Sequence, residues 1–323
     1  MTASTHIPVI DIHNLEHDPE VLYQVHQACR DWGFFQIVGH SVPADLLDAT
    51  HASMRAFFAL PIEEKHAIER SATNSWGFYD RELTKNTRDW KQIFDVGPDE
   101  TDGPLAGSIA QWPRGLPDFK HTIEAFYGAC EALSFRLLGA IARCLHMPAT
   151  HLHDAFTPRH SSFLRLNYYP VCDTPAAPDA PTGTPGHFGI NHHTDSGALT
   201  VLLQDDQPGL QVFRRGTWTL VEPNPDALVV NIGDIVQVWS NDRYPAALHR
   251  VLANSRAERF SAPFFFNPVA SATYAPLPGV CSPDEPARYR PINWGEFRAS
   301  RSAGDYADYG EEIQISHYRV ARH

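Results

Sequence analysis

The chain has 323 residues, enough for one large domain or two joined ones, and its formal net charge of −12 argues against a general nucleic-acid binder. No apolar run reaches the roughly 18 residues of a membrane helix, and no secretory signal is visible, so we expect no membrane association. The five cysteines form no C-x-x-C pair, which argues against a disulfide framework or a zinc site and favours a reducing cytoplasm.

The first third of the chain predicts short strands over 7–12 and 34–38 and helices over 18–32 and 43–59. The second helix follows Ser41, a suitable N-cap residue, and stops before Pro61. Residues 70–115 are polar and irregular, with scattered aromatic side chains. A long helix is expected over 116–146, and its apolar stripe is typical of core packing.

From residue 162 the pattern changes to short apolar runs separated by turn signals. Strands are predicted over 163–169, 199–204, 210–213, 218–221, 227–232, 235–239 and 260–266. Many short strands at nearly even spacing indicate a sandwich or a jelly roll. Residues 170–192 contain five prolines and three glycines and predict a long loop, while residues 291–320 look helical again.

One H-x-D motif occurs, His193-Thr194-Asp195. In an extended segment, residues i and i+2 point to the same side, so His193 and Asp195 converge while Thr194 points away. Two imidazoles and one carboxylate suit a non-haem Fe(II) centre, and His249 is the candidate for the third ligand. His192 lacks the carboxylate two residues later and is expected outside the ligand set. The alternative is that these are ordinary surface residues at strand ends.

Arg259-Phe260-Ser261 follows His249 by ten residues and also places two polar side chains on one face. A guanidinium binds a carboxylate through two parallel hydrogen bonds, and a hydroxyl adds a third. The strand continues into Phe264-Phe265-Phe266, which suggests that it is buried. A buried arginine requires an anionic partner, whereas a surface arginine would not.

Together these motifs resemble the iron- and 2-oxoglutarate-dependent dioxygenases, in the branch with isopenicillin N synthase and many plant flavonoid and hormone oxygenases. The resemblance extends over nearly the whole chain. Its further motifs are Asp31-Trp32-Gly33-Phe34-Phe35-Gln36, Asn167-Tyr168-Tyr169-Pro170, Gly209-Leu210-Gln211-Val212 and Asn231-Ile232-Gly233-Asp234. The loop at 170–192 is longer than expected in plant members, and it either covers the active-site mouth or is a surface insertion.

The resemblance implies a mainly β fold with flanking α-helices, built on a double-stranded β-helix (a cupin-like jelly roll). Four segments are expected: an N-terminal region at 1–115, a supporting helix at 116–157, the jelly-roll core at 158–270 and a C-terminal helical extension at 271–323. Within that core, His193, Asp195 and His249 would bind Fe(II). Arg259 and Ser261 would bind 2-oxoglutarate, with Asn167 and Tyr169 as further hydrogen-bond donors.

The implied reaction uses O₂, releases succinate and CO₂ from 2-oxoglutarate, and oxidises a small molecule by hydroxylation, desaturation or cyclisation. Ascorbate is expected to support it in vitro. Phe265 and Asn267 follow Arg259 by six and eight residues, so alternation directs both toward the same cavity, with Phe94 and Tyr79 as further substrate-facing candidates. Phe264 and Phe266 are assigned to the core. These aromatics suggest a largely apolar or aromatic substrate of secondary metabolism.

Two alternatives stay open at this point. An oxidase of the same fold that uses no 2-oxoglutarate can keep the arginine and serine and direct them at a substrate anion. A non-catalytic cupin-like binding module would be marked by a lost metal ligand, and all three ligands are present. The oligomeric state is not encoded in any recognisable pattern.

Overall fold

The computed structural model describes the whole chain except residues 1–5, 100–106, 182–183, 304–312 and 322–323. The helices are α1 (Pro19–Asp31), α2 (Ala44–Phe58), α3 (Ile62–His66), α4 (Phe119–Cys144), α5 (Asp234–Trp239) and α6 (Trp294–Arg301). The N-terminal strands are β1 (Val9–Asp11), β2 (Phe34–Val38), β3 (Gly77–Tyr79), β4 (Leu83–Thr84), β5 (Thr87–Arg88) and β6 (Gln92–Val96). The later strands are β7 (Phe163–Tyr169), β8 (Phe188–His193), β9 (Leu199–Gln204), β10 (Leu210–Arg214), β11 (Thr217–Leu220), β12 (Leu228–Ile232), β13 (His249–Leu252), β14 (Arg259–Phe266), β15 (Thr273–Tyr274) and β16 (Ile292–Asn293).

Two sheets form the core, and neither is closed into a barrel. The large sheet has the order β1-β2-β12-β9-β14-β7-β6-β3, and the small sheet has the order β11-β10-β13-β8. Apolar side chains from both sheets, such as Leu202 and Val229 from the large one and Val212 and Val251 from the small one, share one buried cluster between them. This arrangement confirms the expected mainly β jelly roll with flanking helices. The N-terminal strands β1, β2, β3 and β6 belong to the same large sheet as the later strands β7, β9, β12 and β14.

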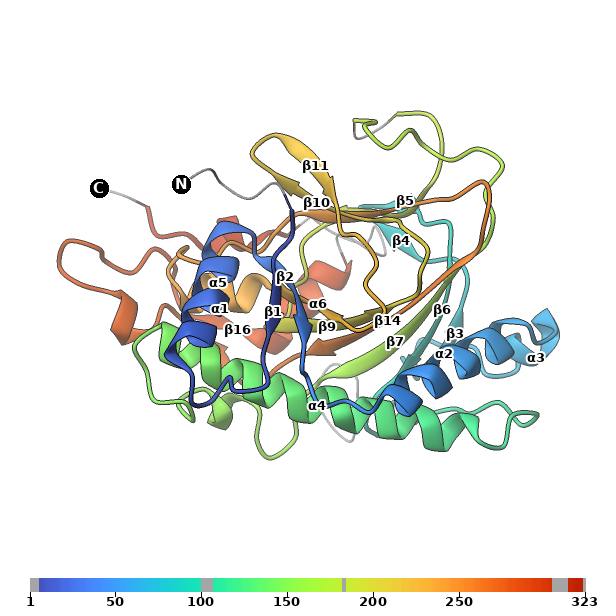
Figure 1. Cartoon of the computed structure of the whole chain (residues 1–323), viewed down its shortest axis with the longest axis horizontal. Coiled ribbons are helices and arrows are strands. Elements are labelled where there is room, and N and C mark those ends of the chain that lie inside the picture. The colour runs from blue at the N-terminus through green and yellow to red at the C-terminus, as the bar shows by residue number, and fades with distance from the viewer. Residues whose placement is uncertain (1–5, 100–106, 182–183, 304–312, 322–323) are drawn as a thin grey trace.

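Helices α2 and α4 cover the other face of the large sheet, where α4 packs on β14 and β9 and α2 packs on β14 and β7 (Figure 1). Alternation along β14 decides which side chains face which layer. Phe264 and Phe266 point to the helical layer, and Phe264 meets Tyr127 of α4 edge to face. Arg259, Ser261 and Phe265 consequently face the space between the sheets.

Helix α4 is long and apolar enough to pass a length and composition test for a membrane span. However, 56% of that stretch is buried inside the protein, where it packs on the large sheet. A core helix gives the same signal, so this finding does not indicate a membrane segment. It also confirms the long core helix expected from the apolar stripe.

Two predicted elements are wrong in kind. Residues 235–239 form helix α5 instead of a strand. Four of these five residues are apolar and buried, and so short an apolar run has no period that distinguishes a strand from a helix. The loop expected over 170–192 ends earlier, since residues 188–193 form β8.

Other predictions miss details or whole short elements. Residues 70–115 are not irregular throughout, because β3 to β6 lie within them. The N-cap of α2 is Pro43 and not Ser41, whose φ is 65°. The tail expected to be helical over 291–320 contains strand β16, helix α6 and a 3-10 turn at Ile315–Tyr318, and its residues 304–312 lie outside the described part of the chain.

The long loop after β7 packs against the outer face of the small sheet. Its Ala176 and Ala180 form a small buried cluster with Phe188. Arg250, the neighbour of His249 in β13, donates hydrogen bonds to the carbonyl oxygens of Pro178 and Ala180 at 2.6 and 2.7 Å. Because neighbouring residues in a strand point to opposite faces, Arg250 holds this loop on the side away from His249. The described part of the loop therefore braces the small sheet from outside.

Candidate functional site

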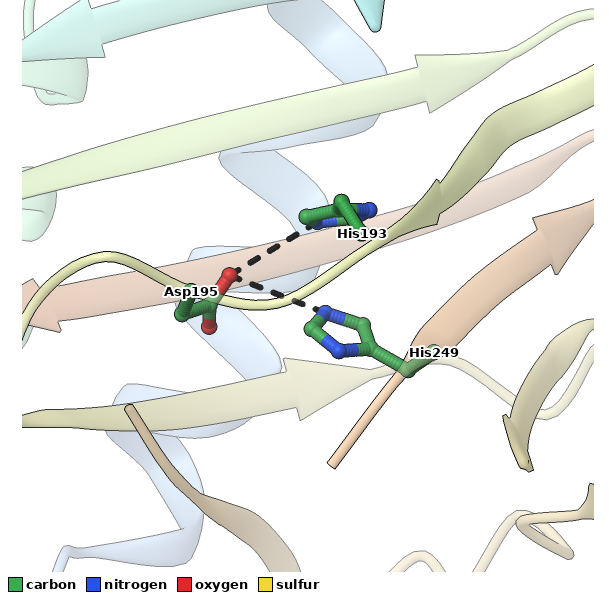
Figure 2. A group of neighbouring side chains, drawn as sticks. All are labelled: His193, Asp195 and His249. Carbon is green, nitrogen blue, oxygen red and sulfur yellow. Dashed lines mark ion pairs between the residues drawn. The ribbon is translucent and has the colours of Figure 1, made fainter. Parts of the chain in front are cut away.

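Three potential metal ligands come together between the sheets (Figure 2). His193 ends β8, Asp195 follows two residues later, and His249 begins β13 directly opposite His193 in the register of the two strands. The Nε2 atoms of both histidines lie 3.6 Å from Oδ1 of Asp195, and the three ligand atoms lie within 4.8 Å of one another. This spacing suits a single metal ion between them.

Hydrogen bonds orient the three side chains. His193 Nδ1 donates to the Asn191 carbonyl at 2.8 Å, and His249 Nδ1 donates to the Ala247 carbonyl at 3.0 Å, so each Nε2 presents its lone pair to the centre. Oδ2 of Asp195 accepts from Asn231 Nδ2 at 2.8 Å and from the Thr200 hydroxyl. Its Oδ1 stays directed at the two histidines.

The electrostatics of the triad favour the protonation states that bind metal. Burial, together with the neighbouring His249, lowers the pKa of His193 to about 3, so its imidazole is neutral at neutral pH. Burial of Asp195 opposes its ionisation, but the two histidines and the hydrogen bonds to Oδ2 hold the pKa of this carboxyl below its usual value. A neutral imidazole and an ionised carboxylate are the ligand forms.

The segment between the ligands is anchored from the C-terminal helix. Arg301 of α6 donates to the carbonyl and the hydroxyl of Thr194 at 3.1 Å and to Oδ2 of Asp234 at 2.7 Å. The backbone N–H of Asp234 donates to the Asp195 carbonyl at 2.8 Å. The sequence motif Asn231-Ile232-Gly233-Asp234 contains two of the residues that support Asp195 and Thr194, namely Asn231 and Asp234. No sequence motif indicated the supporting roles of Arg301 and Thr200.

A second polar cluster lies on the inner face of β14 and β7. Arg259 pairs with Tyr169 in the register of these strands, and Ser261 pairs with Asn167. Asn167 Nδ2 donates to the Ser261 hydroxyl at 3.3 Å, and the Tyr169 hydroxyl lies 3.5 Å from it. The structure thus brings together the four side chains that the resemblance assigns to 2-oxoglutarate.

Arg259 is 2% exposed, yet its donors are only partly used. Nε donates to the Gln207 carbonyl at 3.1 Å and Nη2 to Oε1 of Gln204 at 3.2 Å, and both acceptors are neutral. Nη1 of Arg259, Oδ1 of Asn167 and Nε2 of Gln204 are buried without a hydrogen-bond partner among the described residues. The Asp205 carboxylate is near enough to feel the charge of Arg259, but Nη1 still lacks an acceptor, so the residues present fit a carboxylate ligand.

The four side chains expected to face substrate lie in different surroundings. Phe265 is half-buried on the inner face and stacks on Phe163 with 4.8 Å between ring centroids. Asn267 is buried, and its amide nitrogen donates to the Ser161 carbonyl. Tyr79 is half-buried, and the Arg70 guanidinium lies 3.8 Å above its ring.

The position of Phe94 does not support a contact with substrate. It is fully buried, and its ring packs against Phe57 of α2 and Phe119 of α4. It therefore faces the helical layer, on the opposite side of the large sheet from Arg259. Alternation along β6 places Ile93 and Asp95 on the inner face instead.

Two family models match the chain. The model of the 2OG-Fe(II) oxygenase superfamily matches residues 160–268, and that of the N-terminal part of the non-haem dioxygenase in morphine synthesis matches residues 7–118. Jasmonate-induced oxygenase 2 of Arabidopsis thaliana is 32% identical over 307 residues, which cover 92% of this chain and 79% of that protein. Flavanone 3-dioxygenase 2 of Oryza sativa subsp. japonica is 34% identical over 304 residues, which cover 92% of this chain and 84% of that protein.

Solved structures agree with this result. JOX2 in complex with 2OG, Fe and JA superposes with a TM-score of 0.81 at 30% identity, covering 98% of this chain and 90% of that chain. A full-length Neurospora crassa protein in complex with alpha-KG superposes with a TM-score of 0.80 at 25% identity, covering 94% of this chain and 98% of that chain. These complexes favour the co-substrate interpretation over an oxidase without 2-oxoglutarate or a binding module. The chain belongs to the 2OG-Fe(II) oxygenase superfamily and is an Fe(II)- and 2-oxoglutarate-dependent dioxygenase.

Proposed function

We propose that His193, Asp195 and His249 bind the Fe(II) ion and that Arg259 and Ser261 bind the far carboxylate of 2-oxoglutarate. The observation that carries this proposal is the buried guanidinium of Arg259, whose Nη1 has no partner among the described residues. Asn167 and Tyr169, which share the Ser261 hydroxyl, complete the co-substrate site.

Fe(II) and 2-oxoglutarate, when bound together, turn O₂ into an oxidant that breaks a C–H bond, with release of succinate and CO₂. The residues of this chain place and protect that chemistry. His193 and His249 offer neutral nitrogen ligands in a fixed tautomer, and Asp195 offers one negative charge. Two histidines and one carboxylate leave coordination positions open for the co-substrate and O₂.

Apolar walls exclude water from this space. Phe34 packs edge to face on the His249 ring with 5.1 Å between centroids, and Leu202, Val212 and Val229 bury the region between the sheets. A dry site strengthens the interaction between Arg259 and a carboxylate and limits wasteful side reactions of the oxidant.

The proposed substrate is a small molecule with an apolar or aromatic part that stacks against Phe163 and Phe265. The half-buried position of this stacked pair supports the proposal. Solved relatives hold small molecules: JOX2 is complexed with JA, and the Neurospora crassa protein with thymine or 5-formyluracil. Asn267 and Tyr79 are proposed as polar contacts at the same side of the sheet. Position beside the iron then decides between hydroxylation, desaturation and cyclisation.

A role in secondary metabolism and a cytoplasmic location are part of the proposal. Relatives named for flavonoid oxidation support the first. The five cysteines are all free thiols, which supports a reducing compartment that also keeps Fe(II) reduced.

The test is a panel of small aromatic and alicyclic compounds incubated with the protein, Fe(II), ascorbate, 2-oxoglutarate and O₂. Mass spectrometry of each compound is combined with measurement of succinate. The proposal expects a product gaining one oxygen or losing two hydrogens, with one succinate formed per product. Arg259→Leu and Asp195→Ala are expected to abolish both signals. Product formation that needs no 2-oxoglutarate, or that survives in Asp195→Ala, would contradict the proposal.

A further inference from the structure

The metal ligand His193 lies on an edge strand of the small sheet. Strand β8 is the last strand in the order β11-β10-β13-β8, so one side of its backbone has no strand partner within this sheet. An edge strand is hydrogen-bonded to a neighbouring strand on one side only, so fewer backbone contacts fix its register. Its register with β13 is already interrupted between His249 and Val251. The position of His193 therefore depends on what holds β8 from its free side.

The segment between β5 and β6 holds this edge. Trp90 N–H donates to the Phe188 carbonyl at 2.9 Å, and Asn191 N–H donates to Oδ1 of Asp89 at 3.1 Å. The carbonyl of the same residue, Asn191, accepts the hydrogen bond from His193 Nδ1 at 2.8 Å. Two successive hydrogen bonds thus connect the Asp89 carboxylate to the imidazole ring through the backbone of residue 191.

Asp89 is itself fixed by a buried network. Its side chain is fully buried, and Oδ2 accepts from the Thr84 hydroxyl at 2.7 Å and lies 3.2 Å from Lys91 Nζ. Lys91 lies 2.8 Å from Glu82, which also accepts from Arg165 Nη1 at 2.7 Å. Charged groups with several mutual partners keep one geometry, because moving any of them leaves a buried charge unpaired.

We propose that Asp89 is a positioning residue for His193: through the Asn191 backbone it fixes β8 and the ring orientation that presents Nε2 to the metal. This inference rests on the proposed role of His193 as a metal ligand. Groups that orient a ligating histidine typically change metal affinity by about 10- to 100-fold when they are removed. A role in folding alone would lower stability without a specific effect on metal binding.

Asp95 offers a matched control. It lies in the same buried network with a side chain 4% exposed, and both of its oxygens accept from Arg165, at 2.7 and 2.8 Å. Among the described residues, Asp95 makes no hydrogen bond to β8. Removing either carboxylate therefore leaves the network one negative charge short, but only Asp89 touches the strand that carries His193.

The experiment titrates Co(II) into the metal-free full chain and follows binding by the visible absorption of the bound Co(II). The unfolding temperature of each protein is measured as well. The variants are Asp89→Ala, Asp89→Asn, Asp95→Ala and His193→Ala. Asp89→Ala is expected to weaken Co(II) binding about tenfold or more and to alter the absorption band. Asp89→Asn keeps an acceptor oxygen for Asn191 N–H and is expected to bind within about threefold of the parent. Asp95→Ala is expected to lose stability but to keep the parent's affinity.

Parent-like Co(II) binding by Asp89→Ala would overturn the inference, as would equal weakening by Asp95→Ala. If Asp89→Ala fails to fold, Asp89→Glu replaces it, because glutamate keeps the charge but displaces the acceptor oxygen by one methylene. Asp89→Glu is also expected to weaken Co(II) binding, and unchanged Co(II) binding in this variant would overturn the inference. His193→Ala separates the two levels of the argument. If it binds Co(II) like the parent, the proposed metal site fails. If His193→Ala loses binding but Asp89→Ala keeps it, the positioning role alone fails.

Discussion

Replacing Arg259 by leucine separates function from stability. The guanidinium is expected to donate a charge-assisted pair of hydrogen bonds to the co-substrate carboxylate, and losing one partner of a buried charged pair costs about 3 kcal/mol. Each 1.4 kcal/mol is about a factor of ten in affinity, so Kd for 2-oxoglutarate should rise about 100-fold. Arg259→Lys keeps the charge but not the fork and should weaken binding about tenfold.

The effect on stability without ligand should be small. Arg259→Leu loses the hydrogen bonds to Gln207 and Gln204, about 1 kcal/mol each, but it also removes a buried Nη1 that has no hydrogen-bond partner among the described residues. Arg250→Leu is the control, because this equally buried arginine donates to Gln211, Ala180 and Pro178. It should lower the free energy of unfolding by about 3 kcal/mol and leave 2-oxoglutarate affinity unchanged.

The assay is anaerobic titration of 2-oxoglutarate into the Fe(II)-loaded protein, followed by chemical unfolding of the metal-free form. A second readout is thermal stabilisation by 2-oxoglutarate, which should be present in the parent and in Arg250→Leu and absent in Arg259→Leu. Parent-like affinity in Arg259→Leu would refute the assignment of this residue. So would weakening that appears equally in Arg250→Leu.

Three further outcomes are expected. Asp195→Ala should abolish Fe(II) binding in a metal titration. Asn231→Ala, which removes a hydrogen bond to Oδ2 of Asp195, should weaken Fe(II) binding about tenfold. Unchanged Fe(II) binding in either variant would contradict the proposed triad. Phe265→Ala should raise KM for the substrate but not for 2-oxoglutarate, whereas Phe264→Ala should instead lower stability by about 3 kcal/mol. Burial opposes ionisation of Glu82, but Arg165, Lys91 and Arg70 hold its pKa well below the usual value. As the pH falls below about 4.5, Glu82 therefore takes up a proton in the unfolded chain before it does so in the folded protein, and the metal-free protein should lose stability. Glu82→Gln should flatten this pH dependence of the unfolding free energy, and an equally steep curve in the variant would contradict the role of Glu82.

The sequence predicted the strands whose two faces differ. In β14 the alternation between core phenylalanines and polar residues indicated both the strand and its orientation, so Arg259 and Ser261 were expected on one face. Asn167 and Tyr169 joined them only through the family resemblance, and the register of β7 with β14 brings all four together. It failed where burial removes the alternation. Helix α5 is short and mostly buried, and its four apolar residues have no period that distinguishes it from a buried strand.

The strands that carry His193 and His249, two of the proposed metal ligands, were also missed as strands. β8 contains Gly189 and Asn191, which have low strand propensity, and it is stabilised by the distant Asp89-Trp90 segment and by β13. β13 has only four residues, too few for a period. The supporting roles of Asp89 and Arg301 come from contacts between residues about 100 apart, at 102 and 107 positions, which no local pattern reports.

The most direct test of the central claim is the stoichiometry and affinity of 2-oxoglutarate binding to the Fe(II)-loaded protein under anaerobic conditions, compared with the Asp195→Ala and Arg259→Leu variants. We expect one Fe(II) and one 2-oxoglutarate per chain in the parent. In Asp195→Ala neither should bind tightly, and Arg259→Leu should bind iron without tight binding of 2-oxoglutarate. Tight 2-oxoglutarate binding in both variants would contradict a site built from this triad and this arginine.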